Sequence, residues 1–345
     1  MRIQYICFTA YSGFAFSAKN NIKALISGGY DISVTPLDLG FNKIVNPSNY
    51  KELRKLVDST PGDIQIYHCI PVMQRRIPYV GRVIGYGTFE HSQYPQEWIN
   101  VLEKNDVVIV PSQFNFNSLA LNNKFYLPHC LDFSEYSYFD KRNFNYRFVY
   151  FGTWKNRKNY DTLLRSFTEE FENENVELVL KVSQNKLNNP LKSISRISRQ
   201  LGKTANISID TQILADHSIS NYLRDFSCMI LPTLGEGFCI PGLQAMASGL
   251  PLIITNYSGC REYANENTSL LLEVEGFEKK KDIDGIVQFR NREWPVLSIN
   301  QLREKMRFAY ENRSVMKNLA ENAYEFVKDK FNYSAILESF EKILK

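Results

Sequence analysis

Residues 231–255 read LPTLGEGFCIPGLQAMASGLPLIIT. The apolar run that leads to Pro232 predicts a β-strand, and Pro241 suits the first turn of a helix that follows. The free N–H groups and the positive dipole end of such a helix start form a site for anions. The same geometry occurs as an ordinary tight turn in α/β proteins, but that turn does not need Glu236 between two glycines. A carboxylate there costs turn stability unless it reaches a partner, so Glu236 is the first candidate site residue.

Short β-rich runs alternate with stretches of helical spacing along the chain. This alternation is typical of parallel sheets with crossover helices and therefore predicts an α/β fold. The predicted strands of the first half are Ile3–Thr9, Tyr30–Pro36, Ile64–His68, Val83–Thr88 and Asp106–Pro111. Those of the second half are Phe148–Gly152, Glu177–Val182, Asn206–Ile209, Cys228–Pro232, Leu252–Thr255 and Ser269–Glu273. The predicted helices are Ala15–Ile26, Asp161–Phe171, Ser218–Ser227, Pro241–Ser248, Leu302–Lys328 and Ser334–Leu344.

A polar and aromatic segment at 132–146 has neither period, and the alternation starts again after it. We therefore expect a domain boundary there, between a first Rossmann-like domain at 1–140 and a second at 147–332. Both domains are expected to be doubly wound. Open sheets of this kind bind ligands beyond the carboxyl ends of their strands, so a cleft between the two domains is the expected site.

The composition excludes several classes of protein. With 41 Lys+Arg and 37 Asp+Glu in 345 residues, the net charge of +4 indicates no polyanionic partner, and we expect no nucleic acid. No run of about 18 apolar residues occurs and the apolar opening is too short for a signal peptide, so a cytoplasmic protein is expected. Six cysteines and four histidines lack metal-ligand spacing, which predicts buried thiols and no metal. Neither a Gly-x-x-x-x-Gly-Lys-Ser/Thr phosphate loop nor a Gly-x-Gly-x-x-Gly fingerprint occurs, which disfavours NTPases and dehydrogenases.

Residues 236–251, EGFCIPGLQAMASGLP, resemble a motif of the retaining GT-B glycosyltransferases, specifically of glycosyltransferase family 4. That family carries a glutamate, seven residues and a second glutamate in a context like E-G-F-G-L-P-x-x-E-A-M-A-x-G-x-P. This chain matches almost throughout, but Gln244 stands at the second acidic position. Segments 84–114 and 148–164 resemble the family in the same order, so the resemblance spans nearly the whole chain.

The resemblance implies roles for the residues of this motif. Glu236 would accept hydrogen bonds from hydroxyls of the donor sugar, while the backbone amides of Gly237 and Phe238 approach the sugar or the diphosphate. The position of Gln244 would hold the ribose hydroxyls of the nucleotide. Glutamine offers one carbonyl acceptor and no charge, so it cannot reproduce a charge-assisted grip through two oxygens. Either ribose binding is weaker, or Gln244 donates to another group.

Residues 148–164, FVYFGTWKNRKNYDTLL, resemble the family's strand, glycine turn and Arg-Lys helix opening. The resemblance implies that Lys158, and with it Arg157, neutralises the departing diphosphate. Without a metal, the charge that grows on a diphosphate must meet fixed cations and helix termini. In isolation the two residues would be a solvated pair at a helix start. Thr153 stands where many members of the family have an arginine, so part of the usual cation set is missing.

In the first half, segments 84–98 and 106–114 resemble a T-F-E…P…W and D-x-V-x-V-P-S-x-F pattern of one branch of the family. Glu90 and His91 follow a predicted strand, and we expect them to position the acceptor, with a structural role as the alternative for each. Gly13 matches the glycine of the family's first loop, which lies beneath the diphosphate. The resemblance also implies that a terminal helix at about 333–345 joins the first domain.

Three further features are weaker candidates. Lys181 ends a predicted strand and is a candidate for contact with the nucleotide, with a structural role as the alternative. His68 also ends a strand and is more typical of a satisfied structural histidine. Asp282-Ile-Asp284 has the spacing with which metal-dependent glycosyltransferases of another architecture hold their ion. It follows three lysines in a charged stretch, however, which indicates a solvated loop.

The resemblance implies retaining, metal-independent transfer of a hexose from a UDP- or GDP-sugar to a hydroxyl of a glycan, lipid-linked or protein acceptor. No cofactor besides this donor is expected, and peripheral membrane contact stays open. One alternative, indicated by Gln244 and Thr153, is a degenerate GT-B protein that binds a sugar nucleotide or a partner without efficient turnover. Another is a different sugar-nucleotide enzyme of the same architecture, such as a non-hydrolysing epimerase or a phosphorylase.

Overall fold

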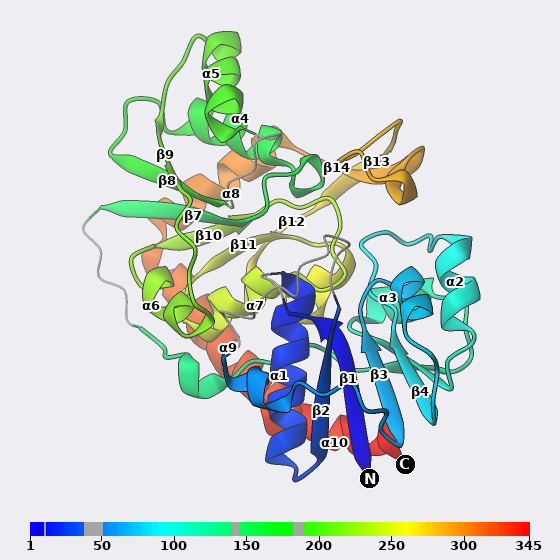
Figure 1. Ribbon diagram of the computed structural model, residues 1–345. Helices are drawn as coiled ribbons and strands as arrows, with labels where there is room; N and C mark the ends of the chain where they lie inside the picture. Colours follow the sequence, from blue (N-terminus) through cyan, green and yellow to red (C-terminus); the bar gives the residue numbers. More distant parts are fainter. Residues whose placement is uncertain (10–11, 38–50, 140–144, 183–188) are drawn as a thin grey trace. The chain divides into compact units, whose positions relative to one another are not determined.

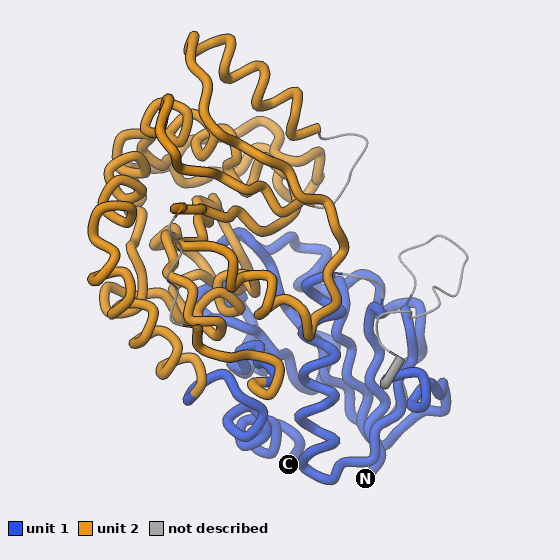
Figure 2. Tube along the Cα trace, turned by 90° about the vertical axis from the view of Figure 1, so that its left-hand side faces the viewer, with its two compact units in different colours: residues 1–132, 329–345 blue, residues 133–328 orange. Residues whose placement is uncertain are grey.

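The computed structural model describes residues 1–9, 12–37, 51–139, 145–182 and 189–345, and the chain divides into two compact units. Residues 1–132 and 329–345 form the first unit, and residues 133–328 form the second (Figure 2). Each unit has a six-stranded sheet in which all neighbouring strands are parallel. This confirms the predicted α/β class with two Rossmann-like domains.

The sheet of the first unit has the strand order β2-β1-β3-β4-β5-β6, of which Figure 1 labels the first four strands. Its strands are β1 (Arg2–Phe8), β2 (Asp31–Leu37), β3 (Ile64–His68), β4 (Arg82–Tyr86), β5 (Val107–Val110) and β6 (Lys124–Tyr126). The predicted strands correspond to β1–β5, whereas β6, with 3 residues, is too short to show a period. Tyr5 of β1 lies between Val34 of β2 and Ile66 of β3 in the register. The strand order reverses between β1 and β3, where sheets of this kind bind ligands.

The helices of the first unit are α1 (Gly13–Ser27), α2 (Gln96–Leu102), α3 (Gln113–Ser118) and α10 (Tyr333–Leu344). Helix α1 begins where Ser12 Oγ accepts the N–H of Ala15 at 3.1 Å, and it ends at a glycine pair in which Gly29 has φ +80°. Helix α10 packs along α1 (Figure 1). Four apolar side chains of α10 complete the core of this unit: Ile336, Phe340, Ile343 and Leu344.

The sheet of the second unit has the order β12-β11-β10-β7-β8-β9. Its strands are β7 (Tyr146–Gly152), β8 (Val176–Val182), β9 (Asn206–Asp210), β10 (Cys228–Leu231), β11 (Leu252–Thr255) and β12 (Leu270–Leu272). The order reverses between β7 and β10. A separate antiparallel hairpin, β13 (Val274–Lys280) and β14 (Arg292–Leu297), was not predicted from the sequence. Its first strand reads VEGFEKK and carries four charged residues, so it lacks the apolar alternation of a core strand.

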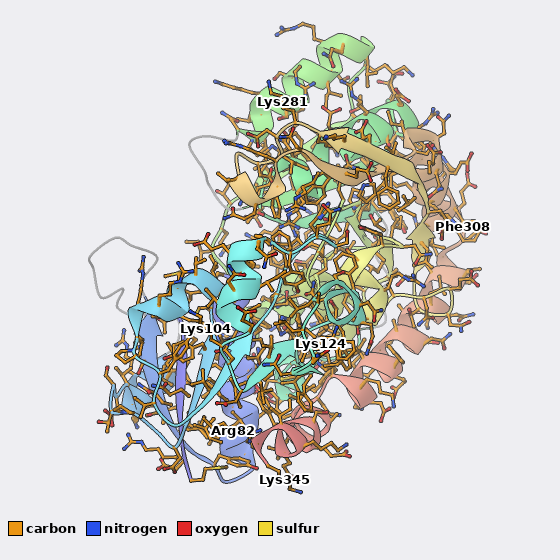
Figure 3. The ribbon with its side chains drawn as sticks, turned by 90° about the vertical axis from the view of Figure 1, so that its right-hand side faces the viewer. Arg82, Lys104, Lys124, Lys281, Phe308 and Lys345 are labelled. Atoms are coloured by element: carbon orange, nitrogen blue, oxygen red, sulfur yellow. The ribbon has the colours of Figure 1, made fainter. Side chains whose placement is uncertain are left out.

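The helices of the second unit are α4 (Tyr160–Glu170), α5 (Pro190–Leu201), α6 (Ile219–Leu223), α7 (Ile240–Ala247), α8 (Ile299–Glu311) and α9 (Arg313–Lys330), of which α9 runs on into the first unit. The single helix predicted at 302–328 is therefore wrong. The chain leaves the helical conformation at Asn312 (φ −110°, ψ 54°), which separates α8 from α9. Phe308, half-exposed on α8, marks the end of that helix in Figure 3. None of the helices in the described part of the chain is long and apolar enough to cross a membrane.

The division between the units falls at 132/133 and 328/329, whereas the sequence suggested that residues up to 140 go with the first domain. Three bonds tie this segment to the second unit. Ser137 N–H donates to Ser220 Oγ at 3.4 Å, Tyr138 OH donates to Glu321 at 3.3 Å, and Tyr136 contacts Gln244. These polar and aromatic residues therefore pack as part of the second unit and do not form a linker.

The contribution of α10 to the first unit can be measured with Phe340, which is fully buried. We expect Phe340→Ala to destabilise the first unit by about 3–5 kcal/mol, because it leaves a cavity in the core. Hydrogen exchange during urea unfolding reports on the two units separately through peptides of β1 and β7. The exposed Lys342→Ala should change neither transition by more than about 0.5 kcal/mol. If Phe340→Ala lowered the free energy of unfolding equally for the β7 peptides, the assignment of α10 to the first unit would be contradicted.

Candidate functional site

The loops that follow β7 and β10 meet at one edge of the second sheet. The two strands are parallel neighbours, with Cys228 of β10 opposite Phe148 of β7. The strand order reverses between them, and parallel strands end at the same edge. Residues 153–159 and residues 232–239 are therefore brought together although they are far apart in the sequence.

A three-residue ion cluster forms where these loops meet. The carboxylate of Glu236, only 5% exposed, lies 2.5 Å from Lys158 Nζ through Oε1 and 3.2 Å from Arg157 Nη1 through Oε2. Thr233 Oγ1 also donates to Oε1, at 2.8 Å. Three of the residues selected from the sequence thus contact one another directly, and Thr233 joins them.

The charges around Glu236 determine its protonation. Burial alone would raise the pKa of its carboxyl, but Lys158 and Arg157, helped by the hydrogen bonds from Lys158 and Thr233, lower the pKa to about 2. The carboxylate is therefore fully ionised at neutral pH. A buried, ionised carboxylate beside two cations can accept hydrogen bonds from hydroxyl groups, while the cations can bind an anionic group.

The backbone around Glu236 is fixed by the loop that follows β11. Glu236 N–H donates to Ser258 Oγ and Gly259 N–H donates to Glu236 O, both at 2.9 Å. A Cβ atom on Gly259 would clash with the backbone carbonyl of Gly237, so no other residue fits there without a shift. The turn around Glu236 is held from behind by this second loop.

Gly237 and Phe238, for which the family resemblance implied contact through backbone amides, complete this buried turn. The Phe238 ring packs 5.6 Å from that of Tyr263. Cys239 then takes a left-handed conformation (φ +69°) and leads into α7, and its carbonyl accepts the Tyr263 hydroxyl at 2.5 Å. Because α7 starts here, the positive end of its dipole lies next to the turn.

Gln244 lies on α7 and is 3% exposed. Its Nε2 donates to the hydroxyl of Tyr136 at 3.2 Å. Of the two outcomes expected for a glutamine at this position, the structure shows a donated hydrogen bond. The partner comes from the segment just before β7, where the sequence gave no sign of a site residue.

Lys181 lies one residue before the end of β8 and is 3% exposed. Its Nζ lies 3.1 Å from Asp210 Oδ1, donates to the carbonyl of Gln212 and sits 5.1 Å from the centre of the Tyr222 ring. These partners belong to the end of β9, to the loop after it and to α6. Lys181 therefore ties β8 to β9 and α6, and these contacts are separate from the bonds around Glu236.

In the first unit, Gly13 is the first residue of α1, directly after Ser12. It lies after β1, next to the place where the strand order reverses. An exposed residue without a side chain at a helix start permits close approach of another molecule to the backbone. The structure is thus compatible with the part that the resemblance implied for Gly13.

Glu90 and His91 lie in the loop after β4, at the carboxyl edge of the first sheet. His91 is buried, and its Nδ1 accepts the N–H of Gln93 at 3.0 Å, so in the neutral ring Nε2 carries the proton. Burial, and after it the charge of Glu90, raise the pKa of Tyr94. Asn115 Nδ2 anchors the loop by donating to Phe89 O at 2.6 Å.

His68 is fully buried at the end of β3. Its Nδ1 lies 2.8 Å from Tyr5 OH, its Nε2 lies 3.0 Å from Ser17 Oγ, and its ring stacks on Tyr86 at 3.7 Å. Burial and the neighbouring His129 hold the pKa of His68 well below its usual range, so the ring is neutral. The structure gives His68 the bonds of a satisfied structural histidine.

Some residues of the site have no local signature in the sequence. Thr233 is an ordinary strand-end threonine by pattern, while Ser258 is marked only by the Ser-Gly pair that follows a strand. Tyr136 belongs to a segment without period. No cluster of three or more His, Cys, Asp or Glu side chains able to hold a metal occurs within the described ranges.

Part of the second unit matches a known protein family. Residues 145–282 match the family model described as "Glycosyl transferases group 1". The matched segment contains Arg157, Lys158, Glu236 and Gln244. No curated protein matches the chain significantly.

Solved structures share the fold over the whole chain. Sucrose-phosphate synthase from Thermosynechococcus elongatus superposes with a TM-score of 0.70 at 14% identity, covering 100% of this chain and 98% of that one. HepE from Anabaena in complex with UDP-glucose gives 0.75 at 11% identity, with 100% and 99% covered. A glycosyltransferase from Rickettsia africae gives 0.67 at 12% identity, with 99% and 97% covered. The fold is therefore GT-B, and the family match together with these structures supports a GT-B glycosyltransferase.

The low pKa of Glu236 predicts a pH dependence of stability. The folded pKa of about 2 lies below the ordinary value of about 4.3, so the stabilisation is present above that value and is lost as the pH falls toward 2. We expect Glu236→Gln to unfold more easily at neutral pH, because Arg157 and Lys158 lose their partner. Its free energy of unfolding should then vary less than that of the wild type as the pH falls.

Urea unfolding at several pH values between about 5 and 3 measures this difference. The exposed Glu266→Gln serves as the control and should follow the wild type. Parallel pH curves for the wild type and Glu236→Gln would show that the cations do not hold the carboxyl ionised.

Proposed function

We propose that the protein is a retaining, metal-independent hexosyltransferase of glycosyltransferase family 4, which uses a UDP- or GDP-sugar as donor. The observation that carries the proposal is the ion cluster of Glu236, Lys158 and Arg157 at the place where the strand order of the second sheet reverses. The group 1 family match covers all three residues. The structure of HepE, which shares the fold, holds UDP-glucose.

The two cations suit a diphosphate leaving group. Negative charge grows on the diphosphate as the sugar leaves, and cations fixed in a buried place stabilise it more than solvated ones would. Arg157 and Lys158 are 9% and 13% exposed at their side chains, and both are held near Glu236 before any ligand arrives. The start of α7 adds a dipole of the same sign.

Glu236 suits the sugar. As an ionised carboxylate it accepts hydrogen bonds from donor hydroxyls, and the backbone of Gly237 and Phe238 lies beside it. In the proposed reaction the acceptor hydroxyl attacks on the face that the diphosphate leaves, a phosphate oxygen takes its proton, and the anomeric configuration is retained. No side chain of the protein then has to act as general base, which fits the pKa of about 2 of Glu236, because a carboxylate with so low a pKa is a weak base.

The acceptor belongs to the first unit in this proposal. Glu90 and His91 lie at the carboxyl edge of its sheet, in a loop anchored by Asn115, and would position a hydroxyl of a glycan, lipid-linked or protein acceptor. Gly13 would lie beneath the diphosphate. A cytoplasmic location, with peripheral membrane contact in the case of a lipid-linked acceptor, is part of the proposal.

A second candidate is a GT-B protein that binds a sugar nucleotide without efficient turnover. It is favoured by one observation, the bond from Gln244 to Tyr136, which engages the amide that would otherwise face the nucleotide ribose. Thr153 also favours this second candidate, because a threonine supplies no third cation beside Arg157 and Lys158. The two candidates differ in whether the bound donor is consumed.

The transfer assay separates these candidates and tests the ion cluster. We expect Lys158→Ala to lower transfer by about 10²–10³-fold, because one fixed charge opposite the leaving group is lost. Lys155→Ala, a neighbouring lysine outside the cluster, should retain most of the activity. Proton NMR of the product should show the anomeric configuration of the donor, and EDTA should not stop the reaction. Full activity of Lys158→Ala would contradict the site assignment.

Thermal shifts with UDP-, GDP- and ADP-sugars identify the donor. A ligand at 100 times its dissociation constant stabilises by about 2.7 kcal/mol, so the bound nucleotide should stand out from the others. Restoring a charged acceptor with Gln244→Glu should tighten nucleotide binding about fivefold, the difference between a charged and a neutral hydrogen bond. Absence of binding and turnover in both forms would exclude the transferase and leave a protein with another ligand.

A further inference from the structure

The two cations of the site are carried by a single turn of 3₁₀ helix, η4 (Asn156–Lys158). The first N–H groups of any helix lack partners within the helix and need an acceptor from outside. The residue in the capping position of η4 is Lys155, which makes no side-chain cap bond. The turn that carries Arg157 and Lys158 is therefore not capped by its own local sequence.

The cap comes from a residue 128 positions further along the chain. Asp284 Oδ1 accepts the N–H of Asn156 at 2.6 Å and the N–H of Arg157 at 3.4 Å. A carboxylate on the first N–H groups of a helical turn does what an aspartate in the capping position does, with the added attraction of its charge to the helix start. Asp284 thus supplies from a distance what Lys155 does not supply locally.

Asp284 sits in the loop between β13 and β14, beside a few buried apolar side chains. Ile283 beside it is 1% exposed, and the buried Phe289 and Trp294 rings pack edge to face at 5.1 Å. Asp284 itself has a left-handed backbone (φ +63°), a conformation that Asp, Asn and Gly tolerate best. Lys281, at the surface of the same loop, marks its place in Figure 3.

The two carboxylates of Asp282-Ile-Asp284 have different partners, and only Asp284 departs from the expected solvated loop. Asp282 stays within the loop, since it accepts Gly285 N–H at 3.1 Å and pairs with Arg290 at 3.3 Å. Asp284 leaves the loop and bonds η4. Its other oxygen, Oδ2, is buried without a hydrogen-bond partner in the described part of the chain, which costs stability.

Besides the Arg157 carbonyl, which accepts Leu234 N–H at 2.8 Å, η4 makes two sets of bonds that respond differently to a ligand. The side chains of Arg157 and Lys158 bond Glu236, and an incoming diphosphate would compete for them. The backbone bonds to Asp284 involve neither cationic group and persist when the side chains turn to the ligand. The position of the turn is then independent of whether the two cations bind Glu236 or phosphate.

We infer that Asp284 is a positioning residue that holds the turn of Arg157 and Lys158 in place for a diphosphate, and that the β13–β14 hairpin serves as its support. The identity of the ligand, a diphosphate, rests on the proposed function. The bonds from η4 to Asp284, which we call the brace, do not depend on it. Asp284 touches no reacting atom and acts only through η4.

Two substitutions at one position separate the bond from the backbone. Asp284→Asn and Asp284→Gly both suit φ +63°, but only the asparagine keeps an oxygen that accepts the two N–H groups. We expect Asp284→Gly to lower kcat/KM for the donor by about ten- to a hundredfold, as small displacements of charged groups do. Asp284→Asn should restore most of the loss, and the acceptor KM should not change in either variant. Lys281→Gly, the same substitution on the surface of the same loop, should behave as the wild type.

Hydrogen exchange gives a readout that needs no donor. The amides of Asn156 and Arg157 should exchange faster in Asp284→Gly than in Asp284→Asn or Lys281→Gly. Unchanged exchange, or unchanged transfer at a temperature at which Asp284→Gly is folded, would overturn the inference. If the wild type neither binds nor transfers a sugar nucleotide, the proposed function fails instead, and amide exchange still decides whether the brace exists.

Discussion

The buried carboxylate of Glu236 is the constraint on which the second unit depends. An ionised carboxylate that is 5% exposed costs several kcal/mol unless charges and hydrogen bonds replace the lost water. Arg157 and Lys158 provide the charges, and these two cations would be equally costly without Glu236. Each loop at the edge of the sheet therefore needs the other. The tight approach of Gly259 to Gly237 and the bond from Glu236 N–H to Ser258 Oγ help to hold this cluster in one geometry.

Much of this arrangement could be predicted from the sequence, because its signals are local. Strand periodicity indicated β1–β5 and β7–β12, and the Glu236 and Lys158 segments matched a family motif. Asp284 and Tyr136 could not be found in this way, since each acts through a bond to a residue more than a hundred positions away. A capping residue normally precedes its helix in the sequence, whereas Asp284 follows η4. It lies in a hairpin whose first strand is charged and therefore lacks the apolar pattern that would have predicted it. Short elements such as β6, and the break at Asn312 within a continuous helical pattern, also leave too little periodicity to detect.

In the proposed function, the residues that meet a ligand are distinct from those that keep them in place. Glu236, Arg157 and Lys158 form the first group, whereas Asp284 bonds the turn of the two cations and Ser258 bonds the backbone of Glu236. Such a division leaves the charged side chains able to exchange partners while the backbone that carries them stays fixed. Gln244, at the position proposed for the ribose, is engaged by its bond to Tyr136. In the proposed function, the affinity for the nucleotide depends on how easily that bond is exchanged.

The core of the first unit includes Ile336, Phe340, Ile343 and Leu344 of α10, although the whole second unit lies between them and residue 132 in the sequence. On the ribosome, residues 1–132 therefore emerge long before the helix that covers α1. Since domains tend to fold in the order of their synthesis, the first unit leaves an apolar face open while residues 133–328 are made. The second unit can finish folding before the first one does. An apolar face that stays open during this interval favours aggregation, which chaperones counteract.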